Sequence, residues 1–309
     1  MSRLQWINEL SEDEVQNIVE SVDIVLFDVD GVLLHNRKVI SGSDNAVMKL
    51  RKLGKIIGFV TNNTLKSLTD FTKALEPFGA KAEEIVNPTQ TLLAYLKKID
   101  FKQDIFGVCC NVLKECLRDE GYNVIDYQDI QKTPLQETFV AVKEMSYKTL
   151  EVCQNVGLVH VDSDFNRNYG TLQAAQIILN NNKDVILTSG ARDDDLPIDE
   201  KLMGIGSKYF IDTLERFTGR QAIKMSKPDK EIRDMVISKF KITDSSRVLM
   251  VGDSILSDIA FGVASRFKTL LILSGILPQT QIAITDNQEI KPNFVAHGLE
   301  ELYQKIINM

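Results

Sequence analysis

The sequence has no apolar run long enough to cross a membrane, and it contains little cysteine and histidine. Its longest apolar stretches, such as TLLILSGIL, fall well short of the roughly 20 residues that a membrane helix needs. The four cysteines show no CxxC spacing and only three histidines accompany them, so we expect reduced thiols rather than a zinc site. The N-terminal stretch MSRLQWINELSEDE is acidic and has no apolar h-region, which predicts no signal peptide and a cytoplasmic location.

Basic residues are also fewer than acidic ones. The chain carries 36 Lys and Arg against 43 Asp and Glu, which gives a formal net charge of −7. This negative field repels nucleic acid and anionic membranes, so we expect neither as a partner, and an anionic substrate would need a local positive site. With 309 residues and an apolar fraction of 44%, the chain is typical of soluble globular proteins and is long enough for two ordinary domains or one large one.

Strand and helix patterns alternate along the first and last thirds of the chain. Short continuous apolar runs, typical of strands that are buried on both faces, are separated by stretches with a helical period, one of them at 257–265. This β-α-β rhythm implies a parallel sheet with helices on both faces. The strand candidates are IVLFD (24–28), IIGFV (56–60), RVLMVGD (247–253) and TLLIL (269–273).

The middle of the chain repeats this rhythm as a separate block. Its strand candidates are DIFGVCC (104–110), FVAVKEM (139–145), VGLVHVD (156–162) and DVILTS (184–189). We therefore expect an inserted domain at 101–223, with 1–100 and 224–309 forming one discontinuous core. The predicted fold class is α/β, with a Rossmann-like, doubly wound parallel-sheet core and an inserted α/β domain.

Two aspartates follow the first strand, in VDIVLFDVDGVLLHN. Asp28 and Asp30 lie two residues apart and so point to the same side, where open parallel sheets bind ligands. Gly31 allows the chain to turn there. Two neighbouring carboxylates are costly unless one keeps a proton or a cation lies between them, so the pair indicates a general acid or a magnesium site. An ordinary surface turn is the alternative.

A second strand end carries hydroxyl and amide groups. Thr61, Asn62 and Asn63 follow IIGFV, and these side chains suit phosphate oxygens. Taken alone, the stretch fits a helix cap or a turn equally well.

Two further segments add a lysine and two acids. Lys227 precedes a proline and a helix that we expect to begin near Asp229, and it could balance a phosphate or a carboxylate. Asp253 ends a strand, and Asp258 lies five residues further on. Acids at a strand end are typical ligands of hard cations, although they also serve as turn and cap residues.

Together, the four segments resemble the motifs of the haloacid dehalogenase-like hydrolase superfamily. DVDGV matches the first motif, TNN the second, KP the third and GDSILSD the fourth, in the same order and over nearly the whole chain. The length of the insert and the forms DxDGV, FVTNN and VGDxxxxDI resemble the branch of 4-nitrophenylphosphatases, phosphoglycolate phosphatases and pyridoxal phosphate phosphatases.

The resemblance implies a role for each acid. Asp28 would be the nucleophile that forms an aspartyl-phosphate, and Asp30 would protonate the leaving oxygen and then activate water. Mg²⁺ would be held by the Asp28 carboxylate, the Asp30 main-chain carbonyl and Asp253. Asp258 would support the water shell of the metal.

The same resemblance implies the phosphate-binding set and a cap. Thr61, Asn62 and Asn63 would bind the phosphoryl group, and Lys227 would offset its charge. The inserted domain would be an α/β cap that closes over the site.

The match is weaker in the inserted domain. Related caps carry Asp-x-His-Phe, whose histidine faces the substrate, whereas this chain reads VDSDF with Asp164 at that place. Thr188 is kept, but Ser189 replaces an asparagine. We expect Asp164 to disfavour leaving groups with a carboxylate or a second phosphate, such as phosphoglycolate, because like charges repel in a closed site. The alternative is that Asp164 faces solvent.

The sequence thus predicts a cytoplasmic, Mg²⁺-dependent phosphatase of small phosphomonoesters, with 4-nitrophenyl phosphate-type activity. A small phosphorylated metabolite is the expected partner, and a homodimer through the cap is expected by analogy alone. A phosphotransferase that uses the same intermediate and a non-catalytic module that retains the fold are the alternatives.

Overall fold

The computed structural model describes residues 4–198, 201–273 and 290–309, and the chain forms two units. The first unit comprises residues 1–61, 68–87 and 227–309, and the second comprises 62–67 and 88–226. Each unit is built on its own parallel sheet. The α/β class and the doubly wound core predicted from the sequence are confirmed.

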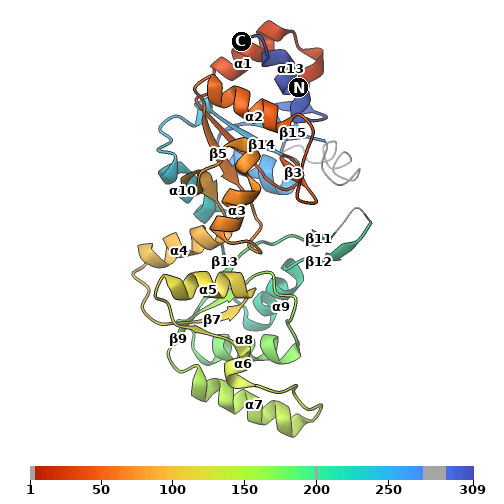
Figure 1. The fold of residues 1–309 in the computed structure, drawn as a ribbon. Coiled ribbons are helices and arrows are strands. Elements are labelled where there is room, and N and C mark those ends of the chain that lie inside the picture. The colour runs from red at the N-terminus through yellow and green to blue at the C-terminus, as the bar shows by residue number, and fades with distance from the viewer. Residues whose placement is uncertain (1–3, 199–200, 274–289) are drawn as a thin grey trace. The chain divides into compact units, whose positions relative to one another are not determined.

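The sheet of the first unit has seven strands in the order β1-β16-β15-β14-β2-β5-β6, and all its neighbours pair in parallel. Figure 1 labels its strands β5, β14 and β15. The strands next to the sheet centre are short apolar runs that are buried on both faces. The strands of this unit are β1 (Gln5–Trp6), β2 (Ile24–Phe27), β5 (Ile56–Val60), β6 (Ile85–Val86), β14 (Val248–Gly252), β15 (Lys268–Ile272) and β16 (Phe294–Ala296), with a small hairpin of β3 (Leu34–His35) and β4 (Lys38–Val39).

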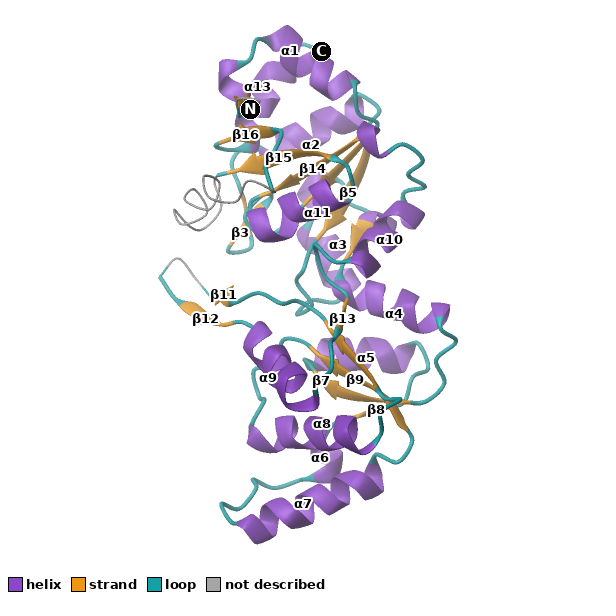
Figure 2. Ribbon diagram, turned by 180° about the vertical axis from the view of Figure 1, so that it is seen from behind, coloured by secondary structure: helices purple, strands orange, loops and turns teal. Residues whose placement is uncertain are grey.

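Helices cover both faces of this sheet. One apolar cluster joins the sheet to α1, α2, α3 and α13, and a second joins it to α10 and α11. Figure 2 shows these helices from behind. Their bounds are α1 (Glu12–Glu20), α2 (Ser43–Lys52), α3 (Leu68–Ala74), α10 (Lys230–Lys239), α11 (Ala260–Ala264) and α13 (Leu299–Ile306).

The second unit has a five-stranded parallel sheet in the order β13-β10-β9-β7-β8. Its strands are β7 (Asp104–Val108), β8 (Val124–Ile125), β9 (Val156–Val161), β10 (Ile186–Ser189) and β13 (Ile223–Lys224), with an antiparallel hairpin of β11 (Asp195–Pro197) and β12 (Met203–Ile205). Its helices are α4 (Pro88–Lys98), α5 (Asn111–Asp119), α6 (Tyr127–Ile130), α7 (Phe139–Val152), α8 (Tyr169–Asn181) and α9 (Lys208–Thr218).

One predicted strand of this unit is wrong. FVAVKEM (139–145) forms the first half of α7, where the side chain of Thr138 caps the helix by accepting from the amide of Ala141 at 3.2 Å. The apolar run is not a buried one, because Phe139 is 94% exposed. The residues that α7 buries are Met145 and Thr149, one helical turn apart. A seven-residue apolar run is therefore too short to distinguish a strand from a helix by its period.

The units also divide at a different place from the boundary at residue 101 expected from the sequence. The second unit begins at Pro88, so that it includes α4. Leu92 and Leu96 of this helix pack with Leu113 and Leu117 of α5 in one apolar cluster. Among the described helices, none combines the length and the hydropathy that crossing a bilayer requires.

Candidate active site

Three of the sequence motifs follow neighbouring strands of the first unit. β2 lies between β14 and β5, and Phe27 pairs with Val251 on one side and Phe59 on the other. Asp253, Asp28 and Thr61 are the residues that directly follow these three strands. Because the carboxyl ends of parallel strands meet at one edge, the sheet gathers these residues there.

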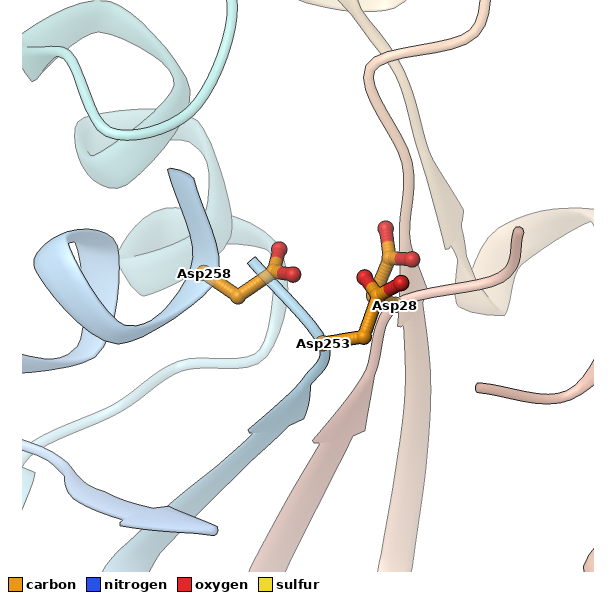
Figure 3. Close-up of side chains that lie close together, drawn as sticks. All are labelled: Asp28, Asp253 and Asp258. Carbon is orange, nitrogen blue, oxygen red and sulfur yellow. The ribbon is translucent and has the colours of Figure 1, made fainter. Parts of the chain in front are cut away.

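Three carboxylates of the first unit lie close together. Asp28, Asp253 and Asp258 each offer an oxygen, and these oxygens all lie within 4.8 Å of one another. Figure 3 shows Asp28 and Asp253 at the ends of two neighbouring strands, with the carboxylate of Asp258 directed towards them from a helical turn. Asp28 and Asp258 are buried, and Asp253 is half-buried. This acidic trio is a concentrated negative centre.

Two glycines make this close approach feasible. Gly31 has a φ of +96°, and a Cβ placed on it would lie 2.1 Å from Asp253 Oδ2. A Cβ on Gly252 would lie 2.1 Å from the Cβ of Asp258. Any side chain at either position would displace a member of the acidic trio, so the glycines of the first and fourth motifs serve its packing as well as the turn.

Lys227 supplies the positive charge. Its buried Nζ donates to Asp28 Oδ1 at 2.6 Å, to Asp258 Oδ1 at 2.7 Å and to the main-chain oxygen of Val60 at 2.5 Å. One lysine thus joins the ends of β2 and β5 to the turn after β14. A buried charge is tolerated only when it is paired and hydrogen-bonded, and Lys227 meets both conditions.

Burial and mutual repulsion determine the ionisation of the site. Burial raises the pKa of Asp28, and Asp258 and Asp253 raise it further against the lowering effect of Lys227. Burial, supported by Asp258, raises the pKa of Asp253 to about 7. Burial alone would lower the pKa of Lys227, but Asp258 and Asp28 outweigh it, so this pKa is raised. The lysine is therefore charged at neutral pH.

The trio fits a hard divalent cation. Carboxylate oxygens are the ligands that such cations prefer, and two unit charges within 4.8 Å of one another repel by at least about 3.5 kcal/mol at an effective dielectric constant of about 20. A cation among the oxygens would remove this repulsion. Asp258, which the family resemblance predicts to support the water shell of the metal, contributes one of these three oxygens.

The position of Asp258 comes from a local backbone feature. A π-helical turn over Ile255–Ile259 precedes α11, in a region where the sequence predicted a helix at 257–265. Within this turn, Asp258 Oδ2 accepts from the amide of Ser254 at 3.1 Å. The five-residue spacing after Asp253 was the available signal, because one wide turn returns the second acid to the first.

The remaining residues of the first two motifs lie in different surroundings. Asp30 is exposed and is bridged to Leu34 in the loop after β2. Thr61 is buried, and its amide donates to Val86 O at 3.0 Å. The chain then enters the second unit, which contains Asn62 and Asn63. The structure thus gathers Asp28, Thr61, Lys227, Asp253 and Asp258 in one unit and the two asparagines in the other.

The residues singled out in the inserted domain also have defined surroundings. Asp164 is half-buried and accepts from the amide of Asn166 at 2.8 Å, so its carboxylate closes a local turn. Thr188 and Ser189 are fully buried in β10. Thr188 Oγ1 lies 3.0 Å from His160 Nδ1.

Comparison with known proteins defines the class of protein. The family model described as haloacid dehalogenase-like hydrolase matches residues 25–123, and one described as HAD-hydrolase-like matches residues 224–302. Together the two models cover more than half of the chain and all four motifs. The chain belongs to the haloacid dehalogenase-like hydrolases.

Curated relatives of the chain are phosphatases, and solved structures match its fold. The chain is 29% identical to phosphoglycolate phosphatase 1A, chloroplastic, of Arabidopsis thaliana, over 94% of this chain and 78% of the relative. It is 28% identical to the 4-nitrophenylphosphatase of Schizosaccharomyces pombe, over 94% and 97%. Its fold matches the p-nitrophenyl phosphatase from Archaeoglobus fulgidus with a TM-score of 0.74 at 23% identity, over 92% and 98%. Within its family, the protein is a phosphoric monoester hydrolase, which argues against the non-catalytic alternative.

Proposed function

We propose that this phosphatase hydrolyses small phosphomonoesters, including 4-nitrophenyl phosphate, with Mg²⁺ as cofactor and Asp28 as nucleophile. The observation that carries the proposal is the buried Asp28 carboxylate, which Lys227 holds at 2.6 Å beside Asp253 and Asp258. A nucleophile must be fixed before it attacks, and Lys227 fixes one oxygen of Asp28 and leaves the other to react.

The first chemical step transfers the phosphoryl group to the protein. An Asp28 oxygen forms a bond to phosphorus while the bond from phosphorus to the leaving oxygen breaks, and Asp30 gives its proton to that oxygen. In the second step water attacks phosphorus while the bond from phosphorus to the Asp28 oxygen breaks, and Asp30 takes a proton from the water. Inorganic phosphate then leaves, and the Asp28 carboxylate is restored. Exposure of Asp30 suits a group that must exchange protons with substrate and water.

The cofactor would be held by the acidic trio, with the main-chain carbonyl of Asp30 as the further ligand implied by the family resemblance. When bound, Mg²⁺ would supply positive charge against the phosphoryl oxygens. Lys227 adds a fixed charge, because two acids keep its pKa raised. Thr61, Asn62 and Asn63 would donate to the phosphoryl oxygens. Positioning and charge neutralisation together account for most of the expected rate acceleration.

The charge and the cysteines of the chain support a substrate class and a cellular compartment. A negatively charged chain with one concentrated site suits a small phosphorylated metabolite rather than nucleic acid or a membrane surface. The four cysteines are free, which fits a reducing cytoplasmic setting. We extend the proposal to a homodimer through the second unit by family analogy.

Hydrolysis of 4-nitrophenyl phosphate tests the proposal. We expect turnover by the wild-type protein with Mg²⁺, and loss of at least a thousandfold either on chelation or in Asp28→Asn, a loss of about 4 kcal/mol in transition-state stabilisation. Asp23→Asn is the matched control, because Asp23 precedes the same strand at its other end, is exposed, and pairs with Arg247. Equal activity of Asp28→Asn and Asp23→Asn would rule out Asp28 as the nucleophile.

A further inference from the structure

The chain segment that follows Thr61 is built into the second unit. Residues 62–67 belong to that unit, although the strand before them and the helix after them belong to the first. Thr64 is buried, and its Oγ1 donates to Asp162 Oδ1 at 2.9 Å. The Sγ of Cys110 donates to the main-chain oxygen of Thr64 at 3.4 Å. A side chain and a main-chain group of Thr64 therefore both attach this segment to the second unit.

The acceptor of this bond is itself tightly held. Asp162 follows β9 and is fully buried. Its Oδ1 also accepts from the amide of Ser163 at 2.6 Å. A Cβ on Gly190 would lie 1.5 Å from its Oδ2, so the carboxylate is in contact with the neighbouring strand end. Rotation of this carboxylate is therefore blocked by close packing.

The other carboxylate oxygen faces a buried histidine. Among the described residues, Asp162 Oδ2 and His160 Nε2 have no hydrogen-bond partner, and they lie 3.7 Å apart. His160 Nδ1 lies 3.0 Å from Thr188 Oγ1. Thr188, His160, Asp162 and Thr64 thus form a continuous buried row from β10 to the segment after Thr61. A buried carboxylate is costly unless it is hydrogen-bonded, so Asp162 binds its donors strongly.

From this row we infer that Asp162 is a positioning residue for phosphate binding. It acts through Thr64, which it fixes, and the short stretch of main chain then fixes Asn62 and Asn63. The inference rests on the proposed function, in which these asparagines bind the phosphoryl group. Asp162 does not touch the substrate in this scheme. Its effect reaches Asn62 and Asn63 along the covalent chain of the second unit, which Thr61 of the first unit directly precedes.

Inhibition by inorganic phosphate tests this inference, because it reports binding of the phosphoryl group without a leaving group. Thr64→Val removes the donor at nearly constant volume, and Thr64→Ser keeps it. We expect Thr64→Val to raise the inhibition constant of phosphate by about two- to thirtyfold, the range for mutations that alter coupling between sites. Thr64→Ser should stay close to wild type.

A matched control separates positioning from stability. Thr149→Val alters another fully buried threonine of the second unit, whose Oγ1 donates to Met145 O at 2.9 Å within α7. It should lower the melting temperature without changing the inhibition constant. Asp162→Asn retains an acceptor for Thr64 and should resemble wild type in phosphate binding, whereas Asp162→Ala should resemble Thr64→Val. The double variant Thr64→Val/Asp162→Ala should bind phosphate no worse than Asp162→Ala.

Two results would overturn the inference while the phosphatase proposal stands. One is an active Thr64→Val protein with the wild-type inhibition constant. The other is a rise of the same size in the inhibition constant of phosphate for Thr149→Val, which would show that the effect comes from lost stability alone. A wild-type protein with no phosphatase activity and no phosphate inhibition would instead overturn the proposed function and, with it, this inference.

Discussion

Replacement of Lys227 by methionine should destabilise the first unit strongly and in a metal-dependent way. The ammonium group pairs with Asp28 at 2.6 Å and Asp258 at 2.7 Å, and all three side chains are buried. Removal of one partner from a buried ion pair costs about 3–5 kcal/mol, because the other partner is left as an uncompensated charge. Whole domains are stable by about 5–15 kcal/mol. Lys227→Met should therefore lose a large part of the unfolding free energy.

A divalent cation should restore part of this loss. A ligand at 100 times its dissociation constant stabilises the folded state by about 2.7 kcal/mol. The assay is urea unfolding at pH 8, in EDTA and in saturating Mg²⁺, followed by fluorescence. The only tryptophan is Trp6, which lies in β1, so the signal reports the first unit. We expect Mg²⁺ to raise the free energy of unfolding of Lys227→Met by at least as much as it raises that of the wild-type protein.

Lys239 provides the comparison. It is a half-buried lysine of the same unit, and its Nζ donates to the main-chain oxygen of Ile85 at 2.7 Å. Lys239→Met loses one hydrogen bond from a charged donor to a neutral acceptor, so it should cost about 1.5–3 kcal/mol and show no additional dependence on Mg²⁺. If Lys227→Met in EDTA is as stable as Lys239→Met, the ion-pair reasoning is refuted.

Three further predictions concern a thiol, the inserted domain and a turn. Burial raises the pKa of Cys153 to about 12, so that about 0.1% of this thiol is thiolate at pH 9. Its alkylation by iodoacetamide should therefore be about 500 times slower than that of a thiol of pKa 9.0. The measurement is peptide mapping by mass spectrometry, and modification of Cys153 as fast in the folded protein as in urea would contradict the prediction. Asp164→His should raise kcat/KM for phosphoglycolate relative to 4-nitrophenyl phosphate, because it removes a negative charge that repels a carboxylate on the leaving group. An unchanged ratio of the two kcat/KM values would show that Asp164 does not select the substrate. Gly31→Ala should abolish most activity and lower the free energy of unfolding, measured by thermal unfolding, by about 1–3 kcal/mol. Gly121→Ala is the control, because Gly121 also has a positive φ (+88°) but has nothing within 4 Å of an added Cβ, so it should show the backbone strain alone and keep activity. Equal activities of the two variants would refute a steric clash between a residue 31 side chain and the acidic trio.

Several residues of the candidate site could be predicted because each directly follows an apolar strand that is recognisable in the sequence. Asp28, Thr61 and Asp253 each follow a short apolar run, and parallel strands bring their carboxyl ends to one edge whatever lies between them. Lys227 was selected by its place before a proline and a helix, and the structure shows the two carboxylates that it joins. Order along the chain was therefore enough to select these residues.

Other features have a weak local signal or none. The five-residue spacing from Asp253 to Asp258 is a weak signal for the turn that brings Asp258 into the trio, because this π-helical turn depends on hydrogen bonds around Ser254 that composition does not reveal. Thr64 and Asp162 are 98 residues apart, so only the folded second unit pairs them. The apolar residues at 139–145 predict a buried strand, whereas they begin a helix, α7, that exposes Phe139. Tertiary packing decided each of these cases.

Chemical trapping of the intermediate tests the central claim most directly. The protein would be mixed with phosphate-labelled 4-nitrophenyl phosphate and Mg²⁺, quenched in acid within one turnover, and digested for peptide analysis. We expect one label per active site on the peptide that contains Asp28, released by hydroxylamine as an acyl phosphate should be, and none in Asp28→Asn. Steady turnover with the label on another residue, or with no protein-bound label at any quench time, would contradict nucleophilic attack by Asp28.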